Sequence, residues 1–193
     1  MRLILTILFC ITLFTTKAQY DPDVKAVYET VIKARLLRSG NSAFLMDSVN
    51  YYKAGSLKKM ARYYNKMNQS DSFDMQLPGD MNSPALQLRL MFTGDKMIVP
   101  LSAAGEDSAF QKSGVYGWEI FRKNFPSYLG LVTVSPVYFN TVHTIALCHV
   151  EILIGPCGTG AGRFYFMRKN KDNQWQEAGI WESIVPKNNS SEK

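Results

Sequence analysis

Side chains that bind metals are scarce in this sequence. Its 193 residues include two histidines, His143 and His149, and three cysteines. The histidines are not spaced as the His-x₃-His pair of a metal-binding helix, and no Cys-x₂-Cys pair occurs. We therefore expect no metal site, and no sequence motif indicates another cofactor.

Long apolar runs are also lacking beyond the N-terminus. Residues 3–14 form an almost continuous apolar run, preceded by Met1-Arg2 and followed by polar residues 15–17 and Ala18. About a dozen apolar residues are too few to cross a bilayer, which needs about 18. A charged start, an apolar run and a small residue are typical of a secretory signal peptide. We predict cleavage after Ala18 and a soluble periplasmic or extracellular protein, which meets the membrane only through the uncleaved signal peptide.

Charge is not concentrated in a way that indicates nucleic-acid binding. The net charge is +6, and removal of residues 1–18 lowers it to +4, because that segment has two basic residues and no acidic one. The densest basic clusters are the pairs Lys58-Lys59 and Arg168-Lys169. Such pairs are typical of a solvated surface, so nucleic acid is not an expected partner.

The chain after the signal peptide predicts a single α+β domain over residues 19–185 and a polar tail over 186–193. Asp21-Pro22 is typical of a helix start. Residues 86–92 alternate between apolar and polar, which predicts a half-buried strand that pairs with the strand after the turn at 93–96. Helices are predicted over 21–39, from 56 onward and over 117–125; strands are predicted over 44–52, 86–92, 97–101, 129–139, 144–154, 163–168 and 174–185.

The last four predicted strands follow one another through short connections, which is typical of an antiparallel meander. The predicted fold is therefore a set of N-terminal helices that pack on one face of a curved antiparallel sheet, which ends in this four-stranded meander.

After signal cleavage two cysteines remain, Cys148 and Cys157. In an extended strand Cys148 lies about 20 Å from Ile154, and three further residues can return only about 10 Å. A disulfide needs Cα atoms within about 7 Å of each other. We therefore predict two free thiols.

The glycine-rich segment 155–162 contains Cys157 and connects two predicted strands. No helix follows it, so the phosphate-loop and dinucleotide-loop interpretations do not apply, and a turn is the simpler interpretation. An alternative is a thiol-dependent hydrolase with Cys157 as nucleophile, His149 as base and Glu151 to orient the base. Strand alternation places His149 and Glu151 on one face, with Cys148 on the other.

Aromatic residues recur at helix and strand spacing, among them Phe121, Phe164 and Trp181. Core packing is the simplest interpretation of these positions. The alternative is an apolar pocket in the curved sheet, lined by tyrosine, tryptophan and methionine. Sequence reasoning leaves both open.

Residues 118–185 carry a longer pattern: W-x-x-F-x-x-x-F-P-x-x-x-G-x-x-x-x-S-x-x-x-F-N, then A-L-x-x-V-E, G-P-C-G-T-G, K-N-K-D-N-Q-W and W-x-S. This pattern resembles a family of small secreted bacterial proteins of unknown function, which carry a Gly-Cys-Gly loop in the same meander. Members of that family have a further cysteine just before the loop, where this chain has Ile154. The resemblance brings no activity. A looser similarity, over 164–181, is to NTF2-like domains, whose helices and curved sheet form a cone-shaped pocket.

The function predicted on this basis is that of an exported binding or interaction domain without catalytic activity. A small molecule, a glycan or an envelope protein is the expected partner. The alternatives are the thiol hydrolase and an NTF2-like domain with a small-molecule pocket.

Overall fold

The computed structural model of this protein describes most of the chain between Asp21 and Glu182. The predicted signal peptide, the polar tail and Cys157 lie outside the described residues. These are 21–39, 42–49, 54–68, 73–74, 84–101, 105, 109–110, 114–155 and 160–182.

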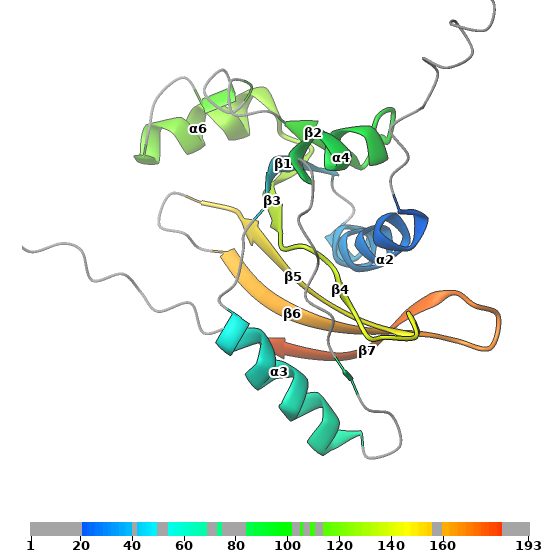
Figure 1. The fold of residues 1–193 in the computed structure, drawn as a ribbon. Helices are drawn as coiled ribbons and strands as arrows, with labels where there is room; N and C mark the ends of the chain where they lie inside the picture. Colours follow the sequence, from blue (N-terminus) through cyan, green and yellow to red (C-terminus); the bar gives the residue numbers. More distant parts are fainter. Residues whose placement is uncertain are drawn as a thin grey trace, which may run out of the picture.

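A mixed sheet of seven strands runs through the described part of the molecule (Figure 1). Six strands follow the order β2-β1-β3-β5-β6-β7, and β4 pairs with β5. Strand β1 is parallel to both of its neighbours, whereas β3, β5, β6 and β7 form the predicted antiparallel meander. The strands are β1 (Ser42–Val49), β2 (Ile98–Leu101), β3 (Tyr128–Val134), β4 (Tyr138–Phe139), β5 (Ile145–Leu153), β6 (Gly160–Lys169) and β7 (Trp175–Glu182).

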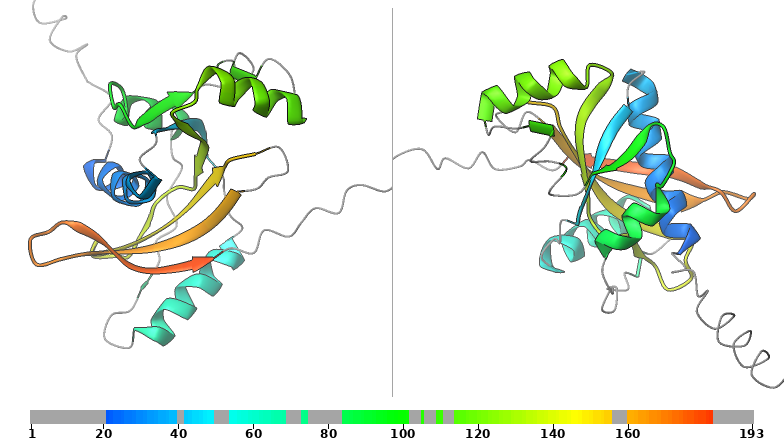
Figure 2. Two further views of the ribbon diagram at one scale, coloured as in Figure 1. Left: turned by 180° about the vertical axis from the view of Figure 1, so that it is seen from behind. Right: turned by 90° about the horizontal axis from the view of Figure 1, so that it is seen from above.

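Helices cover both faces of the sheet, where the sequence analysis expected one (Figure 2). The reason is visible in β5, whose two sets of alternating side chains are both largely apolar and buried. A strand that is apolar on both faces must be covered on both. Helices α2 (Pro22–Ser39) and α4 (Pro84–Met91) pack on one face, and α3 (Ala54–Met67) and α6 (Gly114–Asn124) pack on the other.

The strand predicted over 86–92 is wrong, because this segment is helix α4. Pro84 suits the first turn of a helix, and the leucines, glutamine, arginine and methionine that follow are good helix formers. Leu88, Met91 and Phe92 are buried, whereas Leu90 is 41% exposed. Buried positions three and four residues apart define one side of a helix. Consequently β2 has no hairpin partner before the turn and pairs in parallel with β1.

The strand predicted over 129–139 is interrupted. It divides into β3 and β4 around Pro136, which has no N–H group to donate to a ladder. Ser135 substitutes for the missing ladder contacts: its backbone N–H donates to the carbonyl of His149, and its Oγ accepts the N–H of His149 at 2.8 Å.

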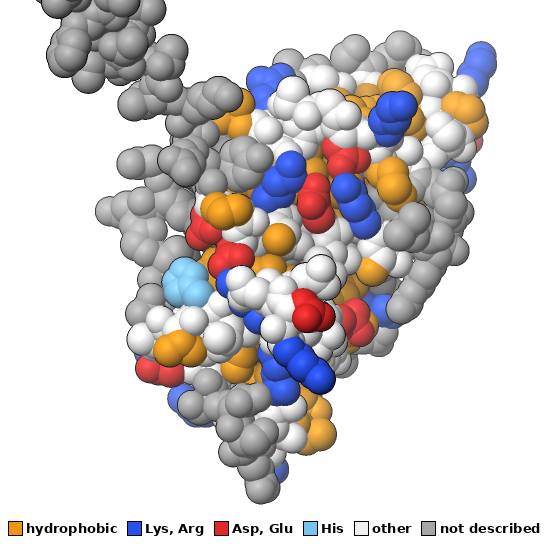
Figure 3. Space-filling view, turned by 90° about the vertical axis from the view of Figure 1, so that its right-hand side faces the viewer, with side chains coloured by type: hydrophobic (Ala, Val, Ile, Leu, Met, Phe, Trp, Pro, Cys, Tyr) orange, Lys and Arg blue, Asp and Glu red, His pale blue; other side chains and the backbone are white. Residues whose placement is uncertain are grey.

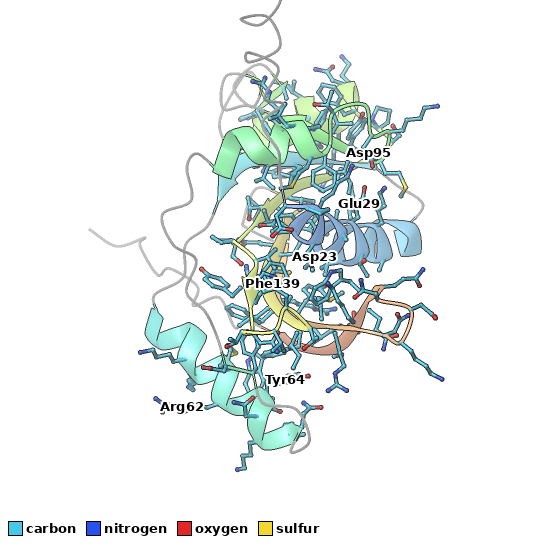
Figure 4. The ribbon with its side chains drawn as sticks, turned by 45° about the vertical axis from the view of Figure 1, so that its right-hand side comes forward. Asp23, Glu29, Arg62, Tyr64, Asp95 and Phe139 are labelled. Atoms are coloured by element: carbon cyan, nitrogen blue, oxygen red, sulfur yellow. The ribbon has the colours of Figure 1, made fainter. Side chains whose placement is uncertain are left out.

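Helix α2 is held to the sheet by charges that neutralise one another. Asp23 accepts hydrogen bonds from Lys169 Nζ at 2.8 Å and from Trp175 Nε1 at 3.0 Å. Lys33 forms ion pairs with Glu29 at 3.4 Å and with Asp95 at 2.9 Å. Basic and acidic side chains therefore lie next to one another over this face (Figure 3), and Figure 4 marks Asp23, Glu29 and Asp95 along it.

Candidate ligand-binding groove

Helix α3 has one apolar side that fits the sheet. Met60, Ala61 and Tyr64 are buried there, as their spacing predicts, against Phe164 and Phe166 of β6. The helix begins at Ala54, two residues before the predicted start at residue 56.

A groove of about 280 Å³ lies between the C-terminal half of α3 and strand β7. Two aromatic contacts shape it: Tyr64 stacks on Phe166 with ring centroids 4.6 Å apart, and Tyr63 meets Trp181 edge-on at 3.9 Å. In Figure 4 Tyr64 lies on the side of α3 that faces the strands. The described residues that line the groove are Tyr63, Tyr64, Met67, Asn68, Phe166, Ala178, Gly179, Ile180 and Trp181.

The groove exists because β7 carries a bulge and a glycine at this point. Phe166 pairs with Gly179 and Met167 pairs with Glu177, so Ala178 is an extra residue in the ladder. A Cβ added at Gly179 would meet nothing within 4 Å. The missing side chain thus leaves open space opposite α3. Within the described residues β7 has no second strand neighbour, so the groove lies at the edge of the sheet.

Exposed apolar side chains gather at this groove. Seven large hydrophobic side chains of the described residues are exposed, and two of them line the groove: Tyr63 at 39% and Met67 at 65%. Ile180, at 40%, belongs to the lining through its position on β7, but it pairs with Tyr165, so its side chain projects to the α2 face. The other four are distributed over α4, α6 and two turns. Single exposed apolar residues need no explanation, whereas a cluster in a concave site marks a binding surface.

The outer side of α3 is uniformly basic. Lys58, Lys59, Arg62 and Lys66 are exposed, and residues 54–67 include no acidic residue. None of these four side chains forms an ion pair with the described part of the chain. Beneath the helix, Arg168 Nη2 donates to the hydroxyl of Tyr64 at 3.0 Å. The groove is therefore a hollow bordered by aromatic rings, with both polar and apolar surface in its lining, beside a cationic helix face.

Of the predicted hydrolase residues, His149 is enclosed. It is 0% exposed, and its ring lies 4.7 Å from that of Phe164. Glu151 is half-buried on the same face of β5. The partner that these two residues would need, Cys157, lies outside the described residues, and the catalytic triad stays a prediction.

The cysteine that the structure describes is inert by position. Cys148 is a free thiol, as predicted, and it is completely buried in the core between the sheet and α2. Burial raises the pKa of this thiol to about 12. The reactive thiolate is therefore almost absent at neutral pH.

His143 stacks on Phe139 in the turn before β5, away from His149 on the strand. Across the described ranges no three histidine, cysteine, aspartate or glutamate side chains are grouped as metal ligands would be. Likewise, none of the helices described here combines the length and apolar character needed to span a bilayer.

Comparisons with protein families, with curated proteins and with solved structures returned no match. The resemblance to small secreted bacterial proteins and the similarity to NTF2-like domains stay predictions.

The motif that carries that resemblance has structural roles in this chain. A side chain at Gly130 would collide with the carbonyl oxygen of Leu153. Asn140 uses its Oδ1 to accept the N–H groups of Thr144 and Ile145, which closes the turn into β5. Together with Ser135, these residues explain the motif through backbone geometry.

Sequence reasoning found part of the groove. Phe166 and Trp181 belong to the aromatic pattern in which an apolar pocket was one of two interpretations. Tyr63, Met67 and Gly179 were missed as site residues. The available signal was helix α3 itself, in which four basic residues occur without an acidic one; part of that signal, Lys58-Lys59, was interpreted as ordinary surface charge.

Proposed function

We propose that this protein is an exported, non-enzymatic binding domain that holds a small, largely apolar ligand in the groove between α3 and β7. The observation that supports this proposal most directly is the open space at Gly179, bordered by the aromatic rings of Tyr63 and Trp181. A concave, mostly apolar site with a few polar groups is the usual form of a small-molecule site. The N-terminal segment 1–18 supports the export part of the proposal.

The size of the groove favours a small molecule over a protein partner. Its volume of about 280 Å³ is close to the lower end of ligand pockets, which span roughly 300–1,000 Å³. That volume suits a small ligand of two or three rings. A stable protein partner would instead need about 800 Å² of contact on each side.

The chemistry of the lining favours binding over catalysis. The described lining residues offer tyrosine hydroxyls and the amide of Asn68, and they include no carboxylate, imidazole or thiol. General acid–base and nucleophilic catalysis rely mainly on those groups. The described lining thus provides shape and apolar contact.

The test uses the neutral fluorescent probe N-phenyl-1-naphthylamine with the mature chain that starts at Gln19. We expect the probe to bind with a rise in fluorescence, and Gly179→Leu to weaken binding at least about tenfold by filling the groove. Glu177→Leu places the same side chain on the other face of β7, because Glu177 pairs with Met167, and it should change the affinity for the neutral probe less than about twofold.

A second pair of variants distinguishes binding in the groove from nonspecific binding to exposed aromatic side chains. Tyr63→Ala removes a groove aromatic, whereas Tyr116→Ala removes an exposed tyrosine, 69% accessible, from α6. We expect a loss of affinity only for Tyr63→Ala, with all variants equally folded by circular dichroism. Probe binding that ignores both Gly179→Leu and Tyr63→Ala, or no binding at all, would overturn the proposal.

A further inference from the structure

We infer that the groove selects anions: its ligand carries a carboxylate, sulfonate or phosphate group that Lys59 and Lys66 hold at the edge of the groove. This inference rests on the proposed function and adds the chemical class of the ligand. The juxtaposition that carries it is a hollow bordered by aromatic rings, with two exposed ammonium groups of α3 on the helix surface beside it.

Helix geometry places these two lysines next to the groove. At about 3.6 residues per turn, Lys59 lies one turn before Tyr63, and Lys66 lies almost one turn after it. Both therefore lie on the part of the helix surface that continues from the exposed ring of Tyr63 and from Met67. In the same geometry Lys58 lies on the opposite flank, next to Asn65, whose side chain bonds the backbone of Phe73.

The cations of α3 are available to an external anion as far as the described residues go, because no described carboxylate neutralises them. Lys59 and Lys66 form no ion pair within the described residues. Lys33 of α2, in contrast, already has two carboxylate partners. An anion bound beside α3 would thus gain interactions with cations that have no competing partner in the described structure.

The nearest described carboxylate on β7 faces away from the groove. Glu177 pairs in the ladder with Met167, whose side chain belongs to the core on the α2 face. Directly paired residues project to the same face of a sheet. On the α3 face Arg168 lies beneath Tyr64. A described carboxylate on that face, Asp74, follows Phe73 on the Asn65 flank of α3 and accepts a hydrogen bond from Thr141.

The experiment compares two probes that share one ring system. 8-Anilinonaphthalene-1-sulfonate carries a negative sulfonate, whereas N-phenyl-1-naphthylamine lacks it and is neutral. We expect the sulfonate probe to bind roughly fivefold to tenfold more tightly to the unmodified mature chain at low salt, as two exposed charge contacts provide. Raising the ionic strength should reduce this preference, because salt screens exposed charges.

Two double variants with the same net charge identify the cations. Lys59→Gln with Lys66→Gln should abolish the preference for the sulfonate and leave binding of the neutral probe unchanged. Lys58→Gln with Lys123→Gln removes two charges from other exposed positions and should retain the preference. Surface substitutions of this kind leave folding intact, which circular dichroism and the neutral probe both check.

The outcomes separate the two proposals. Equal binding of both probes, lost in Gly179→Leu, would overturn the anion inference and leave the proposed groove in place. Insensitivity of both probes to Gly179→Leu would overturn both.

A membrane surface with anionic lipids is the other target to which a basic helix could bind. Sedimentation with vesicles of phosphatidylglycerol tests it. Vesicle binding that depends on Lys58 as much as on Lys59 and Lys66, together with a sulfonate preference that survives Lys59→Gln with Lys66→Gln, would show a membrane contact and would overturn selection by the groove.

Discussion

Helices α2 and α3 both lie on the sheet, on opposite faces, and they treat charge in opposite ways. On α2, Lys25 and Lys33 flank Glu29, and Lys33 also reaches Asp95. Asp23 joins α2 to the last hairpin through Lys169 and through the indole of Trp175. On α3 four cations point to solvent with no acidic residue on the helix.

The difference distinguishes α2, whose charges are paired within the described fold, from α3, whose cations have no described partner. Charges that are paired within the fold contribute to stability and leave little field outside. Cations without a partner among the described residues leave a positive potential at the surface beside them, which the proposed ligand would meet. Because the open space at Gly179 lies on the α3 face, charge and shape point to the same side of the molecule.

The largest expected contrast is in packing. Ile32 of α2 is 0% exposed, whereas Met67 of α3 is 65% exposed. Ile32→Ala should lower the free energy of unfolding by about 3 kcal/mol, through lost burial and a new cavity. Met67→Ala should change it by less than about 0.5 kcal/mol.

Urea denaturation of both variants measures this contrast. A loss of more than about 1.5 kcal/mol in Met67→Ala would mean that the rim of the groove is part of the core, and it would remove the distinction between the two helices.

A smaller contrast is expected for reversal of charge. Lys33→Glu places a carboxylate beside Glu29 and Asp95, and it should cost about 1–2 kcal/mol of unfolding free energy. Lys66→Glu on α3 faces no described partner and should cost less than about 0.5 kcal/mol. Denaturation at low and high salt is the measurement, and the cost of Lys33→Glu should decrease as salt screens the repulsion. Equal losses of unfolding free energy in Lys33→Glu and Lys66→Glu would contradict the conclusion that the charges of α2 are paired within the fold and those of α3 are not.

The smallest expected effect is the dependence of stability on pH. Burial raises the pKa of Asp23 and of Asp95, but hydrogen bonds outweigh it and lower both below the ordinary value of 3.8. Lys169 and Trp175 donate to Asp23; Lys33 and the backbone of Ile98 and Met97 donate to Asp95.

A lowered pKa in the folded state means stability that is present above about pH 4 and is lost as the pH falls through the folded pKa values. The loss should be roughly 1 kcal/mol or less, because both pairs are partly exposed. Urea midpoints measured from pH 6 to pH 2 test this, with Asp23→Asn and Asp95→Asn each expected to flatten the curve. An unchanged slope in both variants would refute it.

Much of the fold could be predicted in segments whose capping residues, apolar pattern and final packing all agree. The Asp21-Pro22 start predicts α2, and Asp21 Oδ1 indeed accepts the N–H of Asp23 at 2.9 Å. The alternation of β5 correctly divided Cys148 from His149. The strand predicted over residues 86–92 was wrong. Apolar residues at every second position also include pairs four apart, which fit one side of a helix, and packing against β1 selected the helix.

The candidate site was harder to predict, because its parts are distant along the chain. Tyr63 and Trp181 meet only when α3 packs beside β7. The open space depends on a bulge, and a bulge is a property of two paired strands rather than of one segment. No local pattern around Gly179 distinguishes it from a glycine in an ordinary turn.

The sequence by itself determined the α+β class, the antiparallel meander and the free thiol of Cys148, since these follow from periodicity and chain length. Only the tertiary structure decided the parallel position of β1, the helices on both faces and the groove beside α3. Local periodicity states which side of a segment is buried, but not which segment covers it. That choice depends on how well the surfaces of the whole chain fit together.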